Sequence, residues 1–396
     1  MTDRVVVVGA SLAGLRAAES VRRAGFPGEV VVLGAERHMP YNRPPLSKTL
    51  DGADPVEWLK PGRHAAEVEW RLGQAVTGSD LSARTVRLES GDVLSWTGLV
   101  VASGLRPRRL DLPEPAAGRY VLRSLEDRDR LLSAFDEVRS LVVIGAGFIG
   151  CEVAAAAAAR GVKTHVVAPE TVPIERPLGP LVGTEIRRRL EALGVLFHLG
   201  TVPVEFRGEA RVRSVVLADW TEIAADAVLE AVGSRPNVEW LSGNGLDLSD
   251  GVRCDEHLRV EHRPDVVACG DVARFPNALF DEVPRRVEHW VTAVDTAKRA
   301  GQVLAAHLRG AGCGDAFAPV PSFWSHQASI RLQAFGAPGL GGDDVRVLEG
   351  ELGGEAAVGY HREGRLVGVV LLGLTARYGY YRKEIERSSG GRPAGR

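Results

Sequence analysis

The chain has 396 residues, of which 45% are hydrophobic and 25% charged, and its formal net charge at pH 7 is −2. This length predicts two or three domains, and the near-neutral charge excludes the strong basic excess of most nucleic-acid-binding proteins. No apolar run is long enough to span a bilayer, and the N-terminus enters a strand pattern without the regions of a signal peptide. The four cysteines are widely spaced, without CxxC or metal-ligand spacing, so we expect no metal site and a reducing, cytoplasmic setting.

The first 36 residues contain an apolar run, a small-residue turn, an amphipathic helix and a second apolar run, VVVVGASLAGLRAAESVRRAGFPGEVVVLGAE. This order predicts a βαβ unit that binds a dinucleotide. Gly9 permits the tight turn, Ser11 stands where a second glycine is usual, and Gly14 lets the helix pack closely on the strand. The helix N-terminus then offers N–H groups to a pyrophosphate. Glu36 lies 22 positions after Gly14, and an acid there is expected to bind ribose hydroxyls.

From Leu141 the chain repeats this pattern as LVVIGAGFIGCEVAAAAAARGVKTHVVAPE. Its motif glycines are Gly145, Gly147 and Gly150. One GxGxxG motif is weak evidence, but two copies in the same context predict two dinucleotide-binding domains. In the second copy the residue after the strand is Ala168, and the nearest acid is Glu170. Positions 168–175 hold no arginine or lysine that could clamp a 2′-phosphate, so we expect NADH rather than NADPH.

Three further segments follow apolar runs at predicted strand ends. VVASGLRPR (100–108) and LEAVGSRPN (229–237) each place a glycine and a proline after such a run, which predicts points where the chain crosses between domains. DVVACGDVARF (265–275) ends in Gly270-Asp271. The Asp271 carboxylate suits a ribityl hydroxyl of a flavin and also a helix N-cap, and the two roles can coexist.

Several separated motifs together resemble one family. They are YNRPPLSK (41–48), GAGFIGCE (145–152), CGDVA (269–273), VEHW (287–290) and FWSHQ (323–327). In this order they resemble the NAD(P)H-dependent ferredoxin reductases of oxygenase systems, which are FAD-dependent pyridine nucleotide oxidoreductases. The resemblance runs from about Val5 to Glu386.

The resemblance implies an α/β fold with two Rossmann-like dinucleotide-binding domains, of the glutathione-reductase type, and a smaller C-terminal α/β domain. An FAD domain would comprise residues 1–112 and 239–318, with an NAD(P)H domain at 113–238 between its halves. The C-terminal domain, 319–396, would end in a disordered tail. The implied activity moves electrons from NADH, with NADPH as the alternative, through FAD to a small iron–sulfur ferredoxin that feeds a P450 or dioxygenase. We expect no nucleic-acid or membrane partner, and a monomer or weak homodimer.

The resemblance also implies roles for single residues. Lys48 and Glu152 would form an ion pair beside the flavin, with Trp290 and Trp324 close to its ring. The residues expected to contact a cofactor are Gly9, Ser11, Ala13, Gly14, Glu36, Arg43, Lys48, Ala102, Gly104, Arg106, Gly145, Gly147, Ile149, Gly150, Glu152, Gly233, Gly270, Asp271, His289, Trp290 and Trp324. Ferredoxin is expected to dock on positive charge, for which the candidates are Arg285, Arg286, Arg377, Arg382 and Lys383. The chain departs from the family pattern at Ala168, where an acid is usual, and at His326, where the family commonly has an aspartate.

Two other classes of function remain open. A disulfide- or peroxide-type oxidoreductase shares this fold but needs a reactive cysteine in the stretch Asn42–Lys48, which contains none. A redox-switched binding protein in the manner of apoptosis-inducing factor is the other class. Because the loop offers only the hydroxyl of Ser47, which is no substitute for a thiolate, we expect that no thiol takes part in turnover.

Overall fold

The computed structural model describes residues 3–48, 56–113, 115, 117–135, 137–261, 263–327 and 330–389. The tail expected at the C-terminus falls largely on residues 390–396, outside this part of the chain. The chain forms two compact units. The first unit is Met1–Asn42, Val56–Arg106 and Arg235–Pro321; the second unit is Arg43–Pro55, Pro107–Ser234 and Ser322–Arg396.

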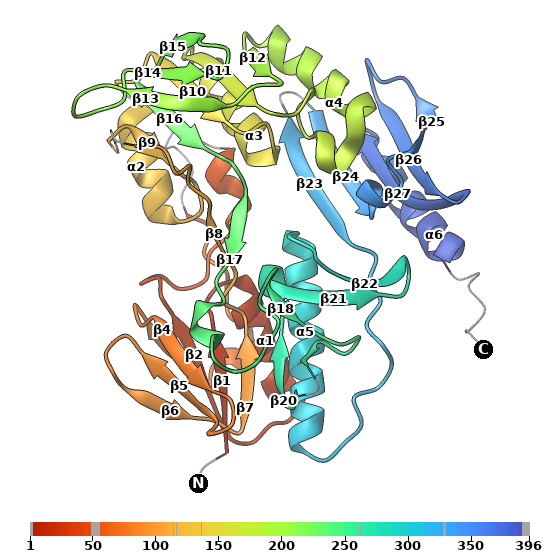
Figure 1. The fold of residues 1–396 in the computed structure, drawn as a ribbon. Coiled ribbons are helices and arrows are strands. Elements are labelled where there is room, and N and C mark those ends of the chain that lie inside the picture. The colour runs from red at the N-terminus through yellow and green to blue at the C-terminus, as the bar shows by residue number, and fades with distance from the viewer. Residues whose placement is uncertain are drawn as a thin grey trace. The chain divides into compact units, whose positions relative to one another are not determined.

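The first unit is built on a six-stranded, mostly parallel sheet with the order β19-β20-β7-β1-β2-β3 (Figure 1). The four valines at the start of the chain form its centre, exposed by 5% or less. Helices α1 and α5 pack together, and a Cβ on Gly301 would lie 2.6 Å from the Ser20 Cβ, so glycine is needed at this crossing. The elements are β1 (Arg4–Val8), α1 (Leu12–Arg23), β2 (Glu29–Gly34), β3 (Val68–Leu72), β4 (Val76–Asp80), β5 (Thr85–Leu88), β6 (Val93–Ser95), β7 (Gly98–Val101), β18 (Val252–Arg253), β19 (Arg259–Val260), β20 (Arg263–Ala268), the 3₁₀ helix η4 (Gly270–Val272), β21 (Ala273–Asn277), β22 (Asp281–Arg286) and α5 (Trp290–Leu308).

The second unit contains a five-stranded parallel sheet with the order β12-β11-β10-β16-β9. Apolar residues on one face of this sheet, such as Val142 and Val167, pack with the three-stranded β13-β14-β15 sheet through Val215 and Leu217. The elements are the 3₁₀ helix η1 (Pro44–Ser47), β9 (Arg119–Tyr120), α2 (Leu125–Phe135), β10 (Ser140–Ile144), α3 (Phe148–Ala159), β11 (Lys163–Ala168), α4 (Glu175–Ala192), β12 (Leu196–Leu199), β13 (Pro203–Arg207), β14 (Ser214–Leu217), β15 (Glu222–Ala224) and β16 (Ala227–Glu230). The chain passes between the units along β8 (Leu105–Pro107) and β17 (Ser234–Pro236).

The C-terminal segment adds an antiparallel sheet to the second unit, with the order β23-β24-β27-β26-β25. Its elements are β23 (Ser322–Gln327), β24 (Ile330–Gly336), β25 (Asp344–Gly350), β26 (Ala356–Arg362), β27 (Arg365–Leu372) and α6 (Tyr378–Ser389). Tyr378 meets Phe335 edge to face at 4.4 Å, and Tyr381 is 5% exposed. Part of the aromatic run that begins α6 therefore packs the helix onto the sheet. This segment, expected as a separate domain, falls in the same compact unit as the second βαβ unit.

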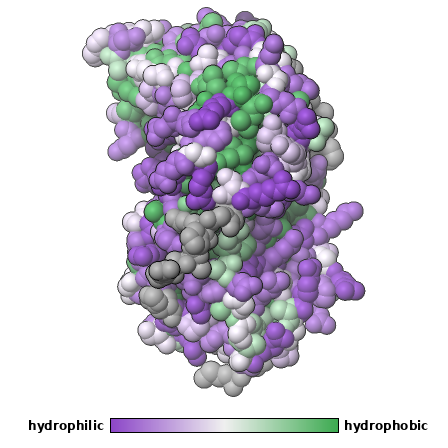
Figure 2. Space-filling view, turned by 90° about the vertical axis from the view of Figure 1, so that its right-hand side faces the viewer, coloured by the Kyte–Doolittle hydropathy of each residue, from purple (hydrophilic) through white to green (hydrophobic). Residues whose placement is uncertain are grey.

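Figure 2 shows one face that is largely hydrophilic, with apolar residues gathered in its upper half. Among the described residues, none of the helices combines the length and the apolar character needed to cross a membrane.

Candidate functional site

The turn between β1 and α1 is a cradle formed by closely approaching backbone segments. Gly9 has φ +118°, and a Cβ there would overlap the Ala102 carbonyl at the end of β7. A Cβ on Gly14 would overlap the Gly9 carbonyl, and one on Gly270 would lie 2.8 Å from the Ala13 Cβ. Ser11 is the N-cap of α1. The structure thus brings the predicted residues of this turn together with the strand ends at Ala102 and Gly270.

Acidic and aromatic side chains follow the strand ends around this cradle. Glu36 lies two residues after β2 and accepts a hydrogen bond from the Tyr41 hydroxyl at 2.6 Å. Asp271 lies in η4, which follows β20 after Cys269. Burial lowers the pKa of His289 to about 4, against the opposing charge of Asp271. His289 is therefore neutral at pH 7, and Trp290, which begins α5 beside it, is partly buried.

Arg106 links the two segments along which the chain passes between the units, through bonds to Asn237 and Glu239. Its guanidinium donates to the Asn237 side-chain oxygen at 2.9 Å and pairs with Glu239. Asn237 N–H donates to the Gly104 carbonyl at 3.0 Å. Gly233, in the second crossing segment, accepts from the Arg108 N–H at 2.9 Å. Arg106 therefore has a structural role in this segment, and its predicted contact with a cofactor stays a prediction.

The turn between β10 and α3 repeats the first cradle. Gly145 has φ +104°, and a Cβ there would overlap the Ala231 carbonyl, while one on Gly150 would overlap the Gly145 carbonyl. A Cβ on Gly147 would meet nothing within 4 Å. The side chain of Ile149 in the first turn of α3 is 43% exposed. The open space at Gly147 is what a pyrophosphate approaching the backbone requires.

Two segments of the second unit, Ser47–Lys48 and Ser325–His326, converge on the carboxylate of Glu152, in the second turn of α3. Lys48 Nζ lies 3.1 Å from Oε2, so the predicted ion pair is present. The Ser47 hydroxyl donates to the same oxygen, and the Ser325 hydroxyl donates to Oε1. The backbone N–H of His326 lies 3.3 Å from Oε1. Glu152 is 5% exposed, and four donors hold its negative charge in place.

Neither Ser47 nor Ser325 was expected to contact Glu152, although both lie within the motifs YNRPPLSK and FWSHQ. The same motifs contain two further residues expected at the site. Arg43 donates to the Arg123 carbonyl at 2.7 Å, and Trp324 lies partly buried on β23. The pKa of His326 is lowered, first by burial and then by the positive charge of Lys48.

Most of the cysteines lie in the core. All four are free, and Cys151, Cys254 and Cys269 are buried. Burial raises the pKa of Cys269 to about 12 and also raises those of Cys151 and Cys254. Within the described ranges there is also no group of three or more His, Cys, Asp or Glu side chains that could hold a metal ion.

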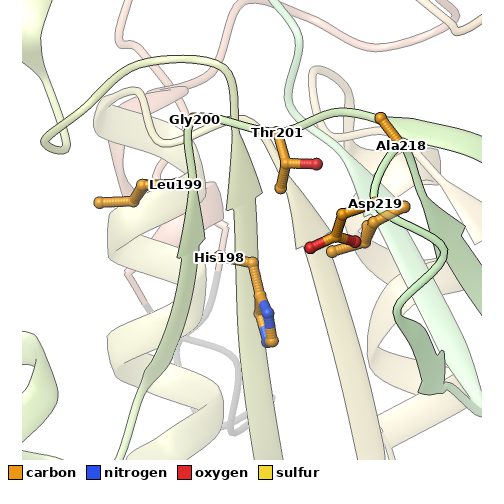
Figure 3. A pocket seen from close by; sticks show the side chains of 7 residues that line it. His198, Leu199, Gly200, Thr201, Ala218 and Asp219 are labelled. Carbon is orange, nitrogen blue, oxygen red and sulfur yellow. The ribbon is translucent and has the colours of Figure 1, made fainter.

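A separate hollow of about 390 Å³ lies between the end of β12 and the β14–β15 turn (Figure 3). His198, Thr201 and Asp219 contribute its polar side chains. The His198 ring stacks on that of His165, with Nδ1 of His165 2.9 Å from Nε2 of His198. Burial lowers the pKa of His165 to about 4. No residue that the sequence predicted for the site lines this hollow.

Comparison with known proteins places these features in a family. The model of the family described as pyridine nucleotide-disulphide oxidoreductase matches residues 3–297. The ferredoxin--NAD(+) reductase component of the anthranilate 1,2-dioxygenase system of Burkholderia cepacia is 33% identical over 97% of this chain and 94% of its own. Putidaredoxin reductase of Pseudomonas putida is 33% identical over 84% of this chain and 80% of its own.

Solved structures agree with these relatives. The chain matches a structure of the covalent putidaredoxin reductase–putidaredoxin complex with a TM-score of 0.90 and 30% identity, over 98% of this chain and 93% of the other. The ferredoxin reductase for the CYP199A2 system from Rhodopseudomonas palustris gives a TM-score of 0.87 and 32% identity, over 96% and 94%. The resemblance and the fold class expected from the sequence are confirmed. The chain belongs to the pyridine nucleotide-disulphide oxidoreductase family, in its branch of ferredoxin reductases.

Proposed function

We propose that this chain is an FAD-dependent oxidoreductase that passes electrons from NADH to a small iron–sulfur ferredoxin serving an oxygenase. The observation that carries the proposal is the repeated βαβ cradle, because transfer between two nucleotide cofactors needs two such sites in one chain. The names of the relatives support the choice of electron acceptor. Four free cysteines favour a reducing compartment, the cytoplasm. We propose a monomer or weak homodimer.

The residues of the first cradle fit FAD. The N-terminus of α1, after the tight turn at Gly9, would take the pyrophosphate, and Glu36 is assigned to the ribose hydroxyls. Asp271 is assigned to the ribityl chain, with Trp290 near the ring. When bound, FAD takes two electrons as a hydride and releases them one at a time, which a nicotinamide does not do.

The second cradle would hold NADH, with the pyrophosphate over Gly147 at the N-terminus of α3. We assign Lys48 and Glu152 to the place where nicotinamide and flavin meet. Glu152 keeps the Lys48 ammonium in one orientation, and the pair brings little net charge to the reacting groups. Arg43 and Trp324, which belong to the same two motifs as Ser47 and Ser325, are assigned to the flavin side.

The chemistry of the thiols argues against the disulfide-reducing members of the family. A reactive cysteine needs a lowered pKa and access to the solvent, whereas three of these four cysteines are buried and have raised pKa values. The fourth, Cys313, has no partner thiol.

Ferredoxin docking is assigned to positive charge, as expected from the sequence. Arg285 pairs with Asp281, Arg286 with Asp250 and Glu288, Arg377 with Glu349, and Arg382 with Glu386. Among the ion pairs of the described residues, none includes Lys383, which is exposed on α6. Lys383 is therefore the candidate whose charge is least compensated.

The test is reduction of the purified yellow protein. We expect flavin absorbance, its rapid bleaching by NADH under anaerobic conditions, and subsequent reduction of a ferredoxin from an oxygenase system. The rate with ferredoxin should fall as ionic strength rises, because docking charges are screened. A protein that takes up no FAD on reconstitution, or one that reduces disulfides and no ferredoxin of a broad panel, would contradict the proposal.

A further inference from the structure

One buried arginine lies at the strand end that carries Asp271. Arg286 is the last residue of β22, and its side chain is only 11% exposed. Its Nε donates to Asp250 Oδ1 at 2.7 Å, and its Nη1 donates to Glu288 Oε1 at 2.7 Å. The same Nη1 donates to the backbone carbonyl of Asp271 at 3.3 Å. One guanidinium therefore joins three segments of the first unit, which are the chain just before β18, η4 and the connection from β22 to α5.

The chain leaves room for this side chain at Gly251. This glycine has φ +82°, and a Cβ there would lie 2.5 Å from Cδ of Arg286 and 2.4 Å from the carbonyl oxygen of Val272. Glycine adopts positive φ without strain and has no side chain. The Arg286 stem can therefore pass Gly251 and reach the carbonyl of Asp271, whereas a larger residue at position 251 would displace either the arginine or η4.

The backbone around Asp271 is held on both sides. Before it, the Gly270 N–H donates to the hydroxyl of Thr296, a buried residue of α5, at 2.9 Å. After it, the carbonyl of Asp271 accepts from Arg286. A 3₁₀ helix of three residues makes few hydrogen bonds of its own. These two bonds therefore fix the backbone from which the Asp271 side chain projects.

The second partner of Arg286 leads to the other residues assigned to the flavin. Glu288 is followed directly by His289, the N-cap of α5, and by Trp290. The bond from Arg286 to Glu288 ties the start of α5 to the guanidinium that also holds the carbonyl of Asp271. One side chain thus connects the segment assigned to the ribityl chain with the segment assigned to the flavin ring.

These contacts favour a positioning role for Arg286 over the docking role expected from the sequence. Two carboxylates, those of Asp250 and Glu288, face one guanidinium, so the group carries no excess positive charge. An acidic partner would have to displace both acids to reach a side chain that is 11% exposed. The neighbouring candidate Arg285 is 39% exposed.

We propose that Arg286 is a positioning residue of the flavin site, which orients Asp271 toward the ribityl chain and fixes Trp290 relative to it. The proposal rests on the proposed function, since it assumes that the first cradle binds FAD with its ribityl chain at Asp271. Arg286 acts through the Asp271 carbonyl and through Glu288, rather than through a contact of its own with the cofactor. Without the shared cation, the carboxylates of Asp250 and Glu288 repel each other and the two flavin segments separate.

The experiment measures how firmly the purified holoprotein holds its FAD. Release after dilution is followed by ultrafiltration, as the flavin absorbance that passes the membrane. Arg286→Met, which keeps the stem without the charge, should release FAD about tenfold faster, equivalent to about 1.4 kcal/mol. The flavin that remains bound should give an altered visible circular dichroism spectrum, because the residues around its ring are no longer held in place.

The control is Arg274→Met. Arg274 lies opposite Arg286 in the register of β21 and β22, is 14% exposed, and bonds instead to Asp247 and Ser249. Its loss should lower the unfolding temperature about as much as Arg286→Met does, but leave both the release of FAD and the flavin spectrum as in the parent. If Arg286→Met matches this control in either measurement while the parent holds FAD, the positioning role is wrong and the proposed function stands.

A second, milder variant decides the question if Arg286→Met gives no folded holoprotein. Glu288→Gln keeps an acceptor for Arg286 but removes its charge, and it should speed the release of FAD by about threefold. Release at the parent rate from this variant would then overturn the positioning role. If the parent protein takes up no FAD at all, both proposals fall.

Discussion

Replacing Glu152 with alanine removes the acceptor on α3 that is shared by four donors from two other segments of the chain. The side chains of Lys48 and Glu152 are only 17% and 5% exposed, so solvent does not replace the lost partner of the ammonium. Breaking one side of a buried ion pair costs about 3–5 kcal/mol. With an unfolding entropy of about 2.1 cal/mol/K per residue over roughly 200 residues of the unit, the midpoint of thermal unfolding should fall by about 7–12 °C.

The assay is thermal unfolding followed by circular dichroism at a fixed excess of FAD, because bound cofactor shifts the midpoint. Glu152→Gln keeps the volume but not the charge and should give a smaller decrease. Adding Lys48→Met to Glu152→Gln should restore part of the loss, since the buried cation is then removed as well. Glu191→Gln, in an exposed pair, is the control and should shift the midpoint by about 1 °C or less. If Glu152→Ala unfolds at the temperature of this control, the carboxylate does not hold the three segments together.

Three further predictions follow from the geometry. Gly147→Ala should unfold at the parent temperature but raise the KM for NADH, because the added Cβ meets no protein atom and enters the space assigned to the pyrophosphate. Gly145→Ala should instead lower the unfolding temperature, since the Cβ added there overlaps a backbone carbonyl. Thermal stability should fall as the pH drops from about 6.5 toward 4, because the unfolded chain binds a proton at His165, whereas in the folded chain this histidine has a pKa of about 4 and stays neutral. His165→Gln should reduce this pH dependence of the unfolding temperature. An identical pH profile in the variant would contradict the assignment. A variant with all four cysteines replaced by alanine or serine that still binds FAD should reduce ferricyanide and ferredoxin with NADH, and loss of both activities would place the chain in the thiol-dependent branch.

The sequence by itself determined the dinucleotide turns. Gly9 and Gly145 occupy backbone conformations with positive φ that other residues rarely adopt, and the apolar runs around them form buried parallel strands. These features are local, because the spacing of glycines and strand residues sets them within about 30 consecutive positions. The motifs were also sufficient to recognise the family and to predict the ion pair of Lys48 with Glu152.

Only the tertiary structure decided which residues surround that ion pair and which acid of the second unit corresponds in position to Glu36. Ser47, Glu152 and Ser325 are more than 100 positions apart in sequence, and no local pattern shows that their side chains meet. Counting from the strand end pointed to Ala168, whereas the hydrogen bond from Gly145 to Val167 aligns Glu170 with Glu36. The position of the strand end depends on how β11 pairs with its neighbours. Pairing register is a property of the assembled sheet. The connection between α3 and β11 is two residues shorter than that between α1 and β2, so the distance from the third glycine to the strand end differs although the motif is the same.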